Sequence, residues 1–204
     1  SLIVSTYQAG QLIIIREQQG QLNTHYTAME RPMGMAFDTN RLIVGGACQT
    51  VEFYNMPAAA GKIEPAGSHD GCYVPRNMHF TGDIDIHEMA YGDEGLWLIN
   101  TKMSCLCLLD DEHSFIPKWR PHFISAYDLT DRCHLNGLAL KDGKPAYMTA
   151  LGKTDTPGGW RANKASGGLM MDVARNEIIA EGLSMPHSPR WHNDKLWYLE
   201  SGNG

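Results

Sequence analysis

The chain has 204 residues, a formal net charge of −6, 43% hydrophobic residues and 20% charged residues. This composition is ordinary for a soluble globular chain that can bury a core. Lysine and arginine are scattered rather than gathered on a basic face, so we expect neither nucleic acid nor a membrane as a partner. The longest apolar runs, such as residues 12–15, are far too short to span a bilayer. The five cysteines include no CxxC pair, which favours a reduced, cytoplasmic chain over a disulfide-rich secreted one.

The chain opens in an apparent strand at residues 2–6. Two further strands follow at residues 11–17 and 21–29 and meet at a Gln-Gln-Gly turn. Four later segments then repeat one phrase, in which an apolar triplet leads through a short polar turn into a second strand. These segments read RPMGMAFDTNRLIVGG, IHEMAYGDEGLWLINT, LNGLALKDGKPAYMTA and PHSPRWHNDKLWYLES.

The spacing of this phrase identifies the fold class. The last strand residue before the turn is Phe37, Tyr91, Leu140 and Trp191 in the four segments, which are therefore 54, 49 and 51 residues apart. Several short strands recurring every ~40 to 50 residues are typical of β-propeller blades. A β-sandwich also fits short strands with Gly/Asp turns, but it would not require the same phrase four times.

We therefore predict an all-β chain, a β-propeller with four-stranded blades repeating about every 50 residues. The predicted single domain covers residues 1–204, with approximate repeat units at 1–30, 31–82, 83–131, 132–184 and 185–204. The units at both ends are partial. Because a propeller closes only when its first and last blades pair, we expect either a fragment of a larger propeller, for example a six-bladed one, or an incompletely closed ring.

The first strand of each blade lines the central channel of a propeller, so equivalent positions on these strands face a common axis. Two residues before each triplet stand Met33, His87, Asn136 and His187. Two residues further back, and on the same face by strand alternation, stand Arg31, Asp85, His134 and Met185. The candidate site is therefore a histidine-lined channel, whose predicted catalytic residues are His87, His134, His187, Asn136 and Asp85.

Two chemistries fit these residues. His87, His134 and His187 could bind a divalent metal such as zinc or iron, with Asp85 orienting a ligand. The same side chains could instead supply a general base near neutral pH without a metal. The ligand would be a small molecule or peptide in the channel, and whether the chain is an enzyme stays open. Alternatively, the histidines are structural and the chain is a non-catalytic protein–protein interaction propeller that binds a protein partner through long loops at residues 57–77, 114–131 and 152–167.

Several long phrases carry a family resemblance, among them DIDIHEMAYGDEGLWLINT, FISAYDLTDRCHLNGLAL and GLSMPHSPRWHNDKLWYLESGNG. Through these phrases the chain resembles a bacterial family of conserved, uncharacterised β-propeller-like proteins. The resemblance implies that the RCHLNG and MPHSPRW phrases, around His134, Asn136 and His187, are family hallmarks. More loosely, PMGMAF and the Leu-Trp strands are similar to gluconolactonase and NHL-type propellers. Those lactonases use carboxylate and Asn metal ligands, whereas this chain places histidines at the corresponding positions.

Overall fold

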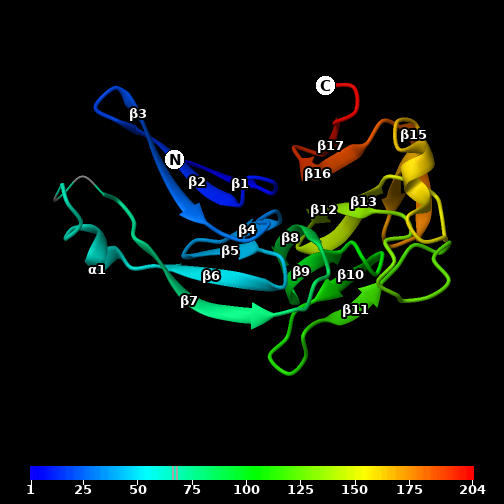
Figure 1. Cartoon of the computed structure of the whole chain (residues 1–204), viewed down its shortest axis with the longest axis horizontal. Helices are drawn as coiled ribbons and strands as arrows, with labels where there is room; N and C mark the ends of the chain where they lie inside the picture. The colour runs from blue at the N-terminus through cyan, green and yellow to red at the C-terminus, as the bar shows by residue number, and fades with distance from the viewer. Residues whose placement is uncertain (66, 68) are drawn as a thin grey trace. The chain divides into compact units, whose positions relative to one another are not determined.

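The computed structural model describes residues 1–65, 67 and 69–204, and it confirms the all-β prediction (Figure 1). Residues 66 and 68, within the predicted loop at 57–77, lie outside the described residues. The chain divides into two compact units, residues 1–82 and 83–204. Their boundary coincides with the predicted boundary between two repeat units. The prediction of a single domain stays a prediction.

The N-terminal unit contains two antiparallel sheets in chain order. The first comprises β1 (Leu2–Thr6), β2 (Gln11–Gln18) and β3 (Gln21–Ala28). The second comprises β4 (Met35–Phe37), β5 (Arg41–Gly45), β6 (Gln49–Asn55) and β7 (Tyr73–Phe80), with one helical turn, α1 (Pro57–Ala60), between its last two strands. The two sheets pack through buried Leu12, Leu42 and Val44.

The C-terminal unit contains three antiparallel sheets. The first two comprise β8 (Ile86–Gly92), β9 (Gly95–Asn100), β10 (Cys105–Leu108) and β11 (Ile116–Trp119), then β12 (Leu135–Lys141), β13 (Lys144–Ala150), β14 (Gly168–Asp172) and β15 (Glu177–Leu183). The third comprises β16 (Pro186–His192) and β17 (Lys195–Glu200). β12 lies against both β8 and β16, so the first strands of successive sheets are neighbours (Figure 1). This arrangement of small sheets is propeller-like.

Tight turns explain why consecutive strands pair. The turns at Gln19-Gly20, Asp142-Gly143 and Asn193-Asp194 each have two consecutive residues with positive φ. This is the type I′ geometry, whose twist matches that of paired strands, and Gly, Asn and Asp adopt it most readily. The polar turns of the third and fourth repeated segments therefore fold those segments back on themselves.

Equivalent positions of the repeat also share an unusual backbone conformation. Arg31, Asp85, His134 and Met185 occupy equivalent positions and have φ of 45°, 56°, 51° and 48°. Positive φ is uncommon for residues other than glycine. Asp85, His134 and Met185 each directly precede the first strand of a sheet, and Arg31 lies a few residues before β4. The sequence equivalence therefore corresponds to a shared local conformation.

Gly137 on β12 lies where a side chain has no room. A Cβ built there would lie 2.3 Å from Cδ of Pro189 and 2.3 Å from Oγ1 of Thr149. We expect Gly137→Ala to lower the free energy of unfolding by about 1–3 kcal/mol, the usual cost of overpacking. Urea denaturation measures this change. Gly61→Ala is the control, because a Cβ there meets nothing within 4 Å, and a comparable loss in both variants would contradict the steric account.

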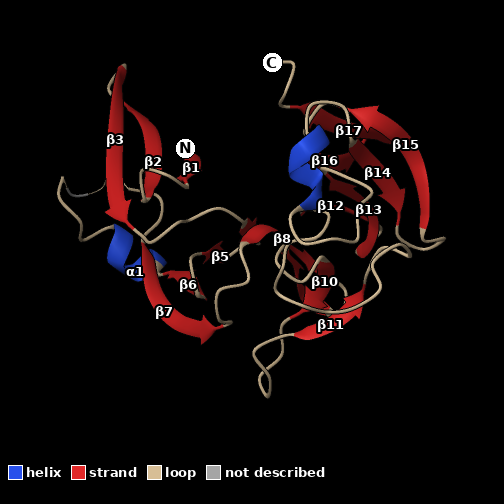
Figure 2. Cartoon of the chain, turned by 45° about the vertical axis from the view of Figure 1, so that its right-hand side comes forward, coloured by secondary structure: helices blue, strands red, loops and turns tan. Residues whose placement is uncertain are grey.

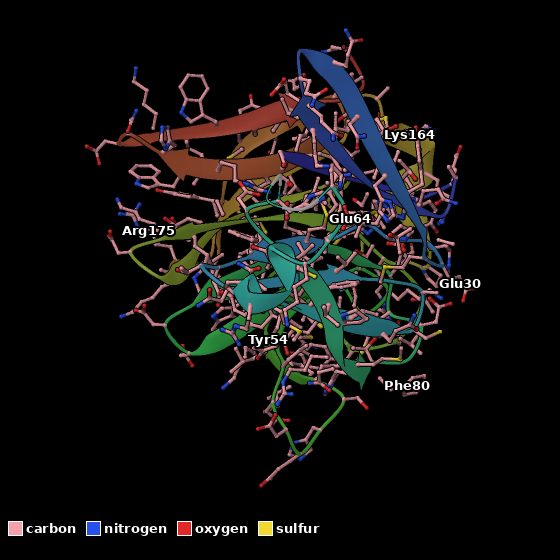
Figure 3. All side chains as sticks on the ribbon, turned by 90° about the vertical axis from the view of Figure 1, so that its left-hand side faces the viewer. Glu30, Tyr54, Glu64, Phe80, Lys164 and Arg175 are labelled. Carbon is pink, nitrogen blue, oxygen red and sulfur yellow. The ribbon has the colours of Figure 1, made fainter. Side chains whose placement is uncertain are left out.

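The last strand is covered less than its counterparts. Trp197 on β17 is 58% exposed, whereas Trp97, 100 residues earlier on β9, is 5% exposed. β17 pairs with β16 alone, whereas β9 pairs with strands on both of its edges. Phe80 at the end of β7 is likewise exposed (Figure 3).

In the described part of the chain, none of the helices is both long and apolar enough to cross a membrane.

Candidate functional site

The predicted site residues lie in the C-terminal unit, where β8, β12 and β16 begin. Each of these strands has an irregularity in its pairing here, between Ile86 and Met89, between Leu135 and Gly137, and between His187 and Arg190. Such bulges re-aim side chains and are common beside functional sites. The three sheets therefore interrupt their regular pairing near the start of these strands. His87, Asn136 and His187 lie at these interruptions, and His134 directly precedes the one in β12.

His87 is held by its Nδ1 atom. This nitrogen lies 3.2 Å from the backbone oxygen of Asp85 and 2.8 Å from Oγ1 of Thr101. The Thr101 hydroxyl donates its own proton to the backbone oxygen of Leu135 at 2.7 Å. Both neighbours of Nδ1 are therefore acceptors, so Nδ1 carries the ring proton and Nε2 keeps its lone pair.

His187 repeats this arrangement two repeat units later. Its Nδ1 atom lies 2.9 Å from the backbone oxygen of Met185 and 3.4 Å from Oγ of Ser201. The carbonyl comes from the residue two positions before the histidine and the hydroxyl from the residue fourteen positions after it, as for His87. The left-handed residue in front of each strand turns its carbonyl onto the ring. His187 is thus also protonated on Nδ1.

Asn136 occupies the equivalent position on the strand between them and links the site to His187. Its amide Nδ2 lies 3.2 Å from Nε2 of His187, and its Oδ1 accepts a hydrogen bond of 2.7 Å from the Thr149 hydroxyl. Asn136 is buried. Because its oxygen is used by Thr149, the amide group must face His187 as a donor.

His134 is oriented by a carboxylate. Its Nδ1 atom lies 3.0 Å from Oδ2 of Asp131, and both side chains are largely buried. The same oxygen accepts a hydrogen bond of 3.0 Å from Nε1 of Trp160 and lies 3.7 Å from the guanidinium of Arg161. The carboxylate fixes the Nδ1–H tautomer of His134, as in a catalytic histidine–aspartate pair.

Ring contacts connect His134 with His87 and with Trp160. The His134 ring packs edge to face on His87, with centroids 4.6 Å apart, and its centroid lies 4.2 Å from that of Trp160. Trp160 is carried by the 3-10 turn η1 (Gly159–Asn163), drawn as the blue helix of the C-terminal unit in Figure 2. Arg161 lies over the Trp160 ring, 4.4 Å from its centroid. The loop at residues 152–167 therefore covers His134.

Arg132 ties this loop to the one that carries Asp131. Its guanidinium donates to Oδ1 of Asp155 at 2.7 Å and to the carboxylate of Asp128. Hydrogen bonds from Ser125 and the contact with Arg132 lower the pKa of Asp155 to about 2. Both carboxylates are thus ionised near neutral pH, and the ion pairs hold the two loops together.

The histidines of β8 and β16 are neutral at physiological pH. Burial, and then the charge of His134, lowers the pKa of His87 to about 3. Burial also lowers the pKa of His187. The carboxylate of Asp85, 3.7 Å from Nδ1 of His87, therefore faces a neutral ring rather than an imidazolium.

A second polar pair crosses the same three strands. Glu88 on β8 is buried and lies 3.0 Å from the guanidinium of Arg190 on β16. The same guanidinium donates to the backbone oxygen of Leu138 on β12, at 3.4 Å. Burial raises the pKa of Glu88, an effect that Arg190 opposes. The pair joins the two outer sheets of the unit across the middle one.

The structure thus brings His87, His134, His187, Asn136 and Asp85 into one region, although their catalytic role stays a prediction. Strand alternation, which was used to place Asp85 and His134 on the same face as His87 and Asn136, does not apply to these two residues. Both residues precede their strands, which begin at Ile86 and Leu135, and both have left-handed backbones. Strand alternation does not extend through such a residue. His134 reaches His87 across neighbouring sheets instead.

Asp131 and Trp160 are not among the predicted site residues. The spacing of Asp131 and His134, three residues apart, was a usable signal. The same spacing occurs at Asp110 and His113, however, where the two side chains pair at 3.0 Å but His113 is exposed. Spacing alone therefore does not separate a buried pair from a surface pair.

The structure gives the metal prediction no support. Among residues 1–65, 67 and 69–204, no group of three or more His, Cys, Asp or Glu side chains is arranged to hold a metal ion. Nε2 of His187, which would face such an ion, accepts a hydrogen bond from Asn136 instead. The ligand role of His87, His134 and His187 therefore stays a prediction.

Comparison with protein families identifies the family of the chain. The family described as "Domain of unknown function (DUF4915)" matches residues 1–204. No curated protein matches the chain.

Proposed function

The chain belongs to the DUF4915 family over residues 1–204, and on the geometry of its site we propose that it binds a small polar molecule at the histidine cluster. In this proposal His134 acts as a general base, and Asp131 is the positioning residue that orients it. The cluster is defined as His87, His134, His187, Asn136 and Asp131. The proposal needs no metal.

One observation carries the proposal. All three histidines direct Nδ1 to an acceptor, which leaves the lone pair on Nε2. A general base must present such a lone pair and must be fixed by a second group. His134 meets both conditions, because Asp131 accepts its Nδ1 proton at 3.0 Å. An imidazolium formed on His134 would be stabilised by the same carboxylate.

The surroundings support a site rather than a packed interior. His87 and His134 remain 10% and 14% exposed, so solvent reaches the cluster, while Trp160 shields one side of it. Partial exclusion of water strengthens electrostatic interactions with a bound molecule. Neutral His87 and His187 supply polar contacts without adding charge next to the base.

The experiment is a screen of small polar metabolites in D2O, followed by proton NMR. Broadened ligand signals report binding, and loss of a C–H signal reports proton abstraction. We expect at least one compound to bind the wild-type chain and to lose binding in His134→Ala but not in the exposed control His192→Ala. If no compound differs between the wild type and His134→Ala in binding or in loss of a C–H signal, the proposal fails. Stoichiometric metal released from the purified chain, and absent from His87→Ala/His187→Ala, would instead favour the metal-dependent form.

Asp131→Asn should separate positioning from binding. The neutral amide no longer accepts the Nδ1 proton of His134 and the Nε1 proton of Trp160 as the carboxylate does. His134 therefore loses its fixed tautomer. For a compound that exchanges a C–H proton, we expect the exchange rate to fall by about 10²–10⁴, a larger factor than the loss of binding. Asp110→Asn is the matched control, since Asp110 and His113 form the same pair on the surface. Equal effects of the two substitutions would contradict the role given to Asp131.

A further inference from the structure

We infer that the histidine cluster recognises a hydrogen-bond-donating group, of which a primary ammonium is the simplest, rather than a carboxylate or phosphate. This inference rests on the proposed function and names the chemical class of its ligand. It comes from accounting for every donor and acceptor that the described side chains of the cluster present.

The donors of the cluster are engaged within the protein. The Nδ1 protons of His87, His134 and His187 go to backbone, hydroxyl or carboxylate oxygens. The indole N–H of Trp160 goes to Asp131. Arg161 lies outside the cluster and is 62% exposed, with its guanidinium 3.7 Å from that carboxylate and over the Trp160 ring.

The hydroxyl and amide groups of the surrounding strands are also used. Thr101 donates to a backbone oxygen, and Thr149 donates to Asn136. Asn136 donates one amide proton to Nε2 of His187. An anion would need several donors directed into the cluster, and the cluster's own residues leave only the second amide proton of Asn136.

Acceptors remain open. Nε2 of His87 and Nε2 of His134 make no hydrogen bond within the described chain, and the two rings are in contact, with centroids 4.6 Å apart. Oδ1 of Asp131 is buried and has no hydrogen-bond partner among the described residues. Buried polar atoms are normally satisfied, so an open acceptor set of this kind indicates a ligand with N–H or O–H groups.

Protonation does not convert the cluster into an anion site. A proton on Nε2 of His87 would place a buried charge beside two other imidazoles, and burial together with the charge of His134 opposes it. The carboxylate of Asp131 further favours a donor or a cation over an anion. The ammonium group of a ligand could thus bridge the two Nε2 atoms.

The test uses the full chain labelled with ¹⁵N and follows the imidazole nitrogens by NMR. Methylammonium chloride is titrated in parallel with sodium acetate and sodium phosphate at matched ionic strength. Because a probe of so few atoms binds weakly, the titrations run into the high millimolar range. We expect methylammonium to move the Nε2 signals of His87 and His134 and to leave their Nδ1 signals and exposed His192 unchanged. The anions should move neither Nε2 signal.

A variant adds an independent check. His87→Leu removes one lone pair and should weaken methylammonium binding, read at His134, at least tenfold, whereas His192→Leu should not. If His87→Leu does not fold, the wild-type titration alone decides.

The outcomes separate the two proposals. Movement of the same Nε2 signals by acetate or phosphate, with no response to methylammonium, overturns the ligand class but leaves the proposed function standing. Zn²⁺ binding at the three histidines without any response to methylammonium also overturns the ligand class, in favour of a metal. Nε2–H tautomers in the unliganded chain would overturn both.

Discussion

Acidification from pH 7 to pH 3 is expected to remove on the order of 4 kcal/mol of stability through His87 alone, with about half of this lost by pH 5. The pKa of His87 is about 3 in the folded chain, compared with an ordinary value of 6.5. Between pH 6.5 and 3, the unfolded chain therefore binds a proton at His87 that the folded chain does not bind. A lowered histidine pKa contributes stability that is present above pH 6.5 and is lost as the pH falls towards 3.

Comparison with His87→Gln isolates this effect from the titration of other groups. The glutamine variant should be less stable at pH 7, but its free energy of unfolding should fall less steeply between pH 6.5 and 3. The difference in slope should approach one proton, about 1.4 kcal/mol per pH unit. Urea denaturation at each pH measures it, and exposed His192→Gln should follow the wild type. Parallel slopes for the wild type and His87→Gln would show that His87 is protonated equally in both states.

The second large effect is expected in the core of the C-terminal unit. Ile99 on β9 is fully buried, so Ile99→Ala should lower the free energy of unfolding by about 2–5 kcal/mol. Its equivalent 100 residues later, Leu199 on β17, is 62% exposed. Leu199→Ala should therefore change stability by no more than about 0.5 kcal/mol.

This pair of variants tests the repeat and the exposure of β17 together, because equivalent positions are truncated in covered and uncovered strands. Chemical denaturation of the same chain measures both variants. A cost for Leu199→Ala as large as that for Ile99→Ala would show that β17 is covered in solution. A negligible cost for Ile99→Ala would contradict the assignment of β9 to the core.

The fold was predictable because its signals are local and repeated. The triplet-turn-strand phrase placed the observed sheets within the predicted units, since a two-residue polar turn determines which strands pair. The equivalence of His87 and His187 also followed from this register. The structure extends it to their partners, as Thr101 and Ser201 hold the two rings in the same way.

The rest of the site depends on features that periodicity does not carry. The left-handed conformation of His134 breaks the alternation that was used to orient it. Trp160 and Asp131 come from irregular loops, and their meeting depends on Arg132, which ties those loops together. The direction of each ring depends on hydrogen bonds to backbone carbonyls, which the identity of the side chains does not reveal. The metal prediction lacks structural support for the same reason.

The protonation state of the three histidines tests the central claim most directly. Long-range ¹H–¹⁵N correlation spectra of the imidazole rings at pH 7 distinguish a protonated Nδ1 from a protonated Nε2. We predict that His87, His134 and His187 are each protonated on Nδ1 and bare on Nε2, and that His134 loses this preference in Asp131→Asn. Rings protonated on Nε2, or a His134 tautomer that Asp131→Asn does not change, would contradict the account.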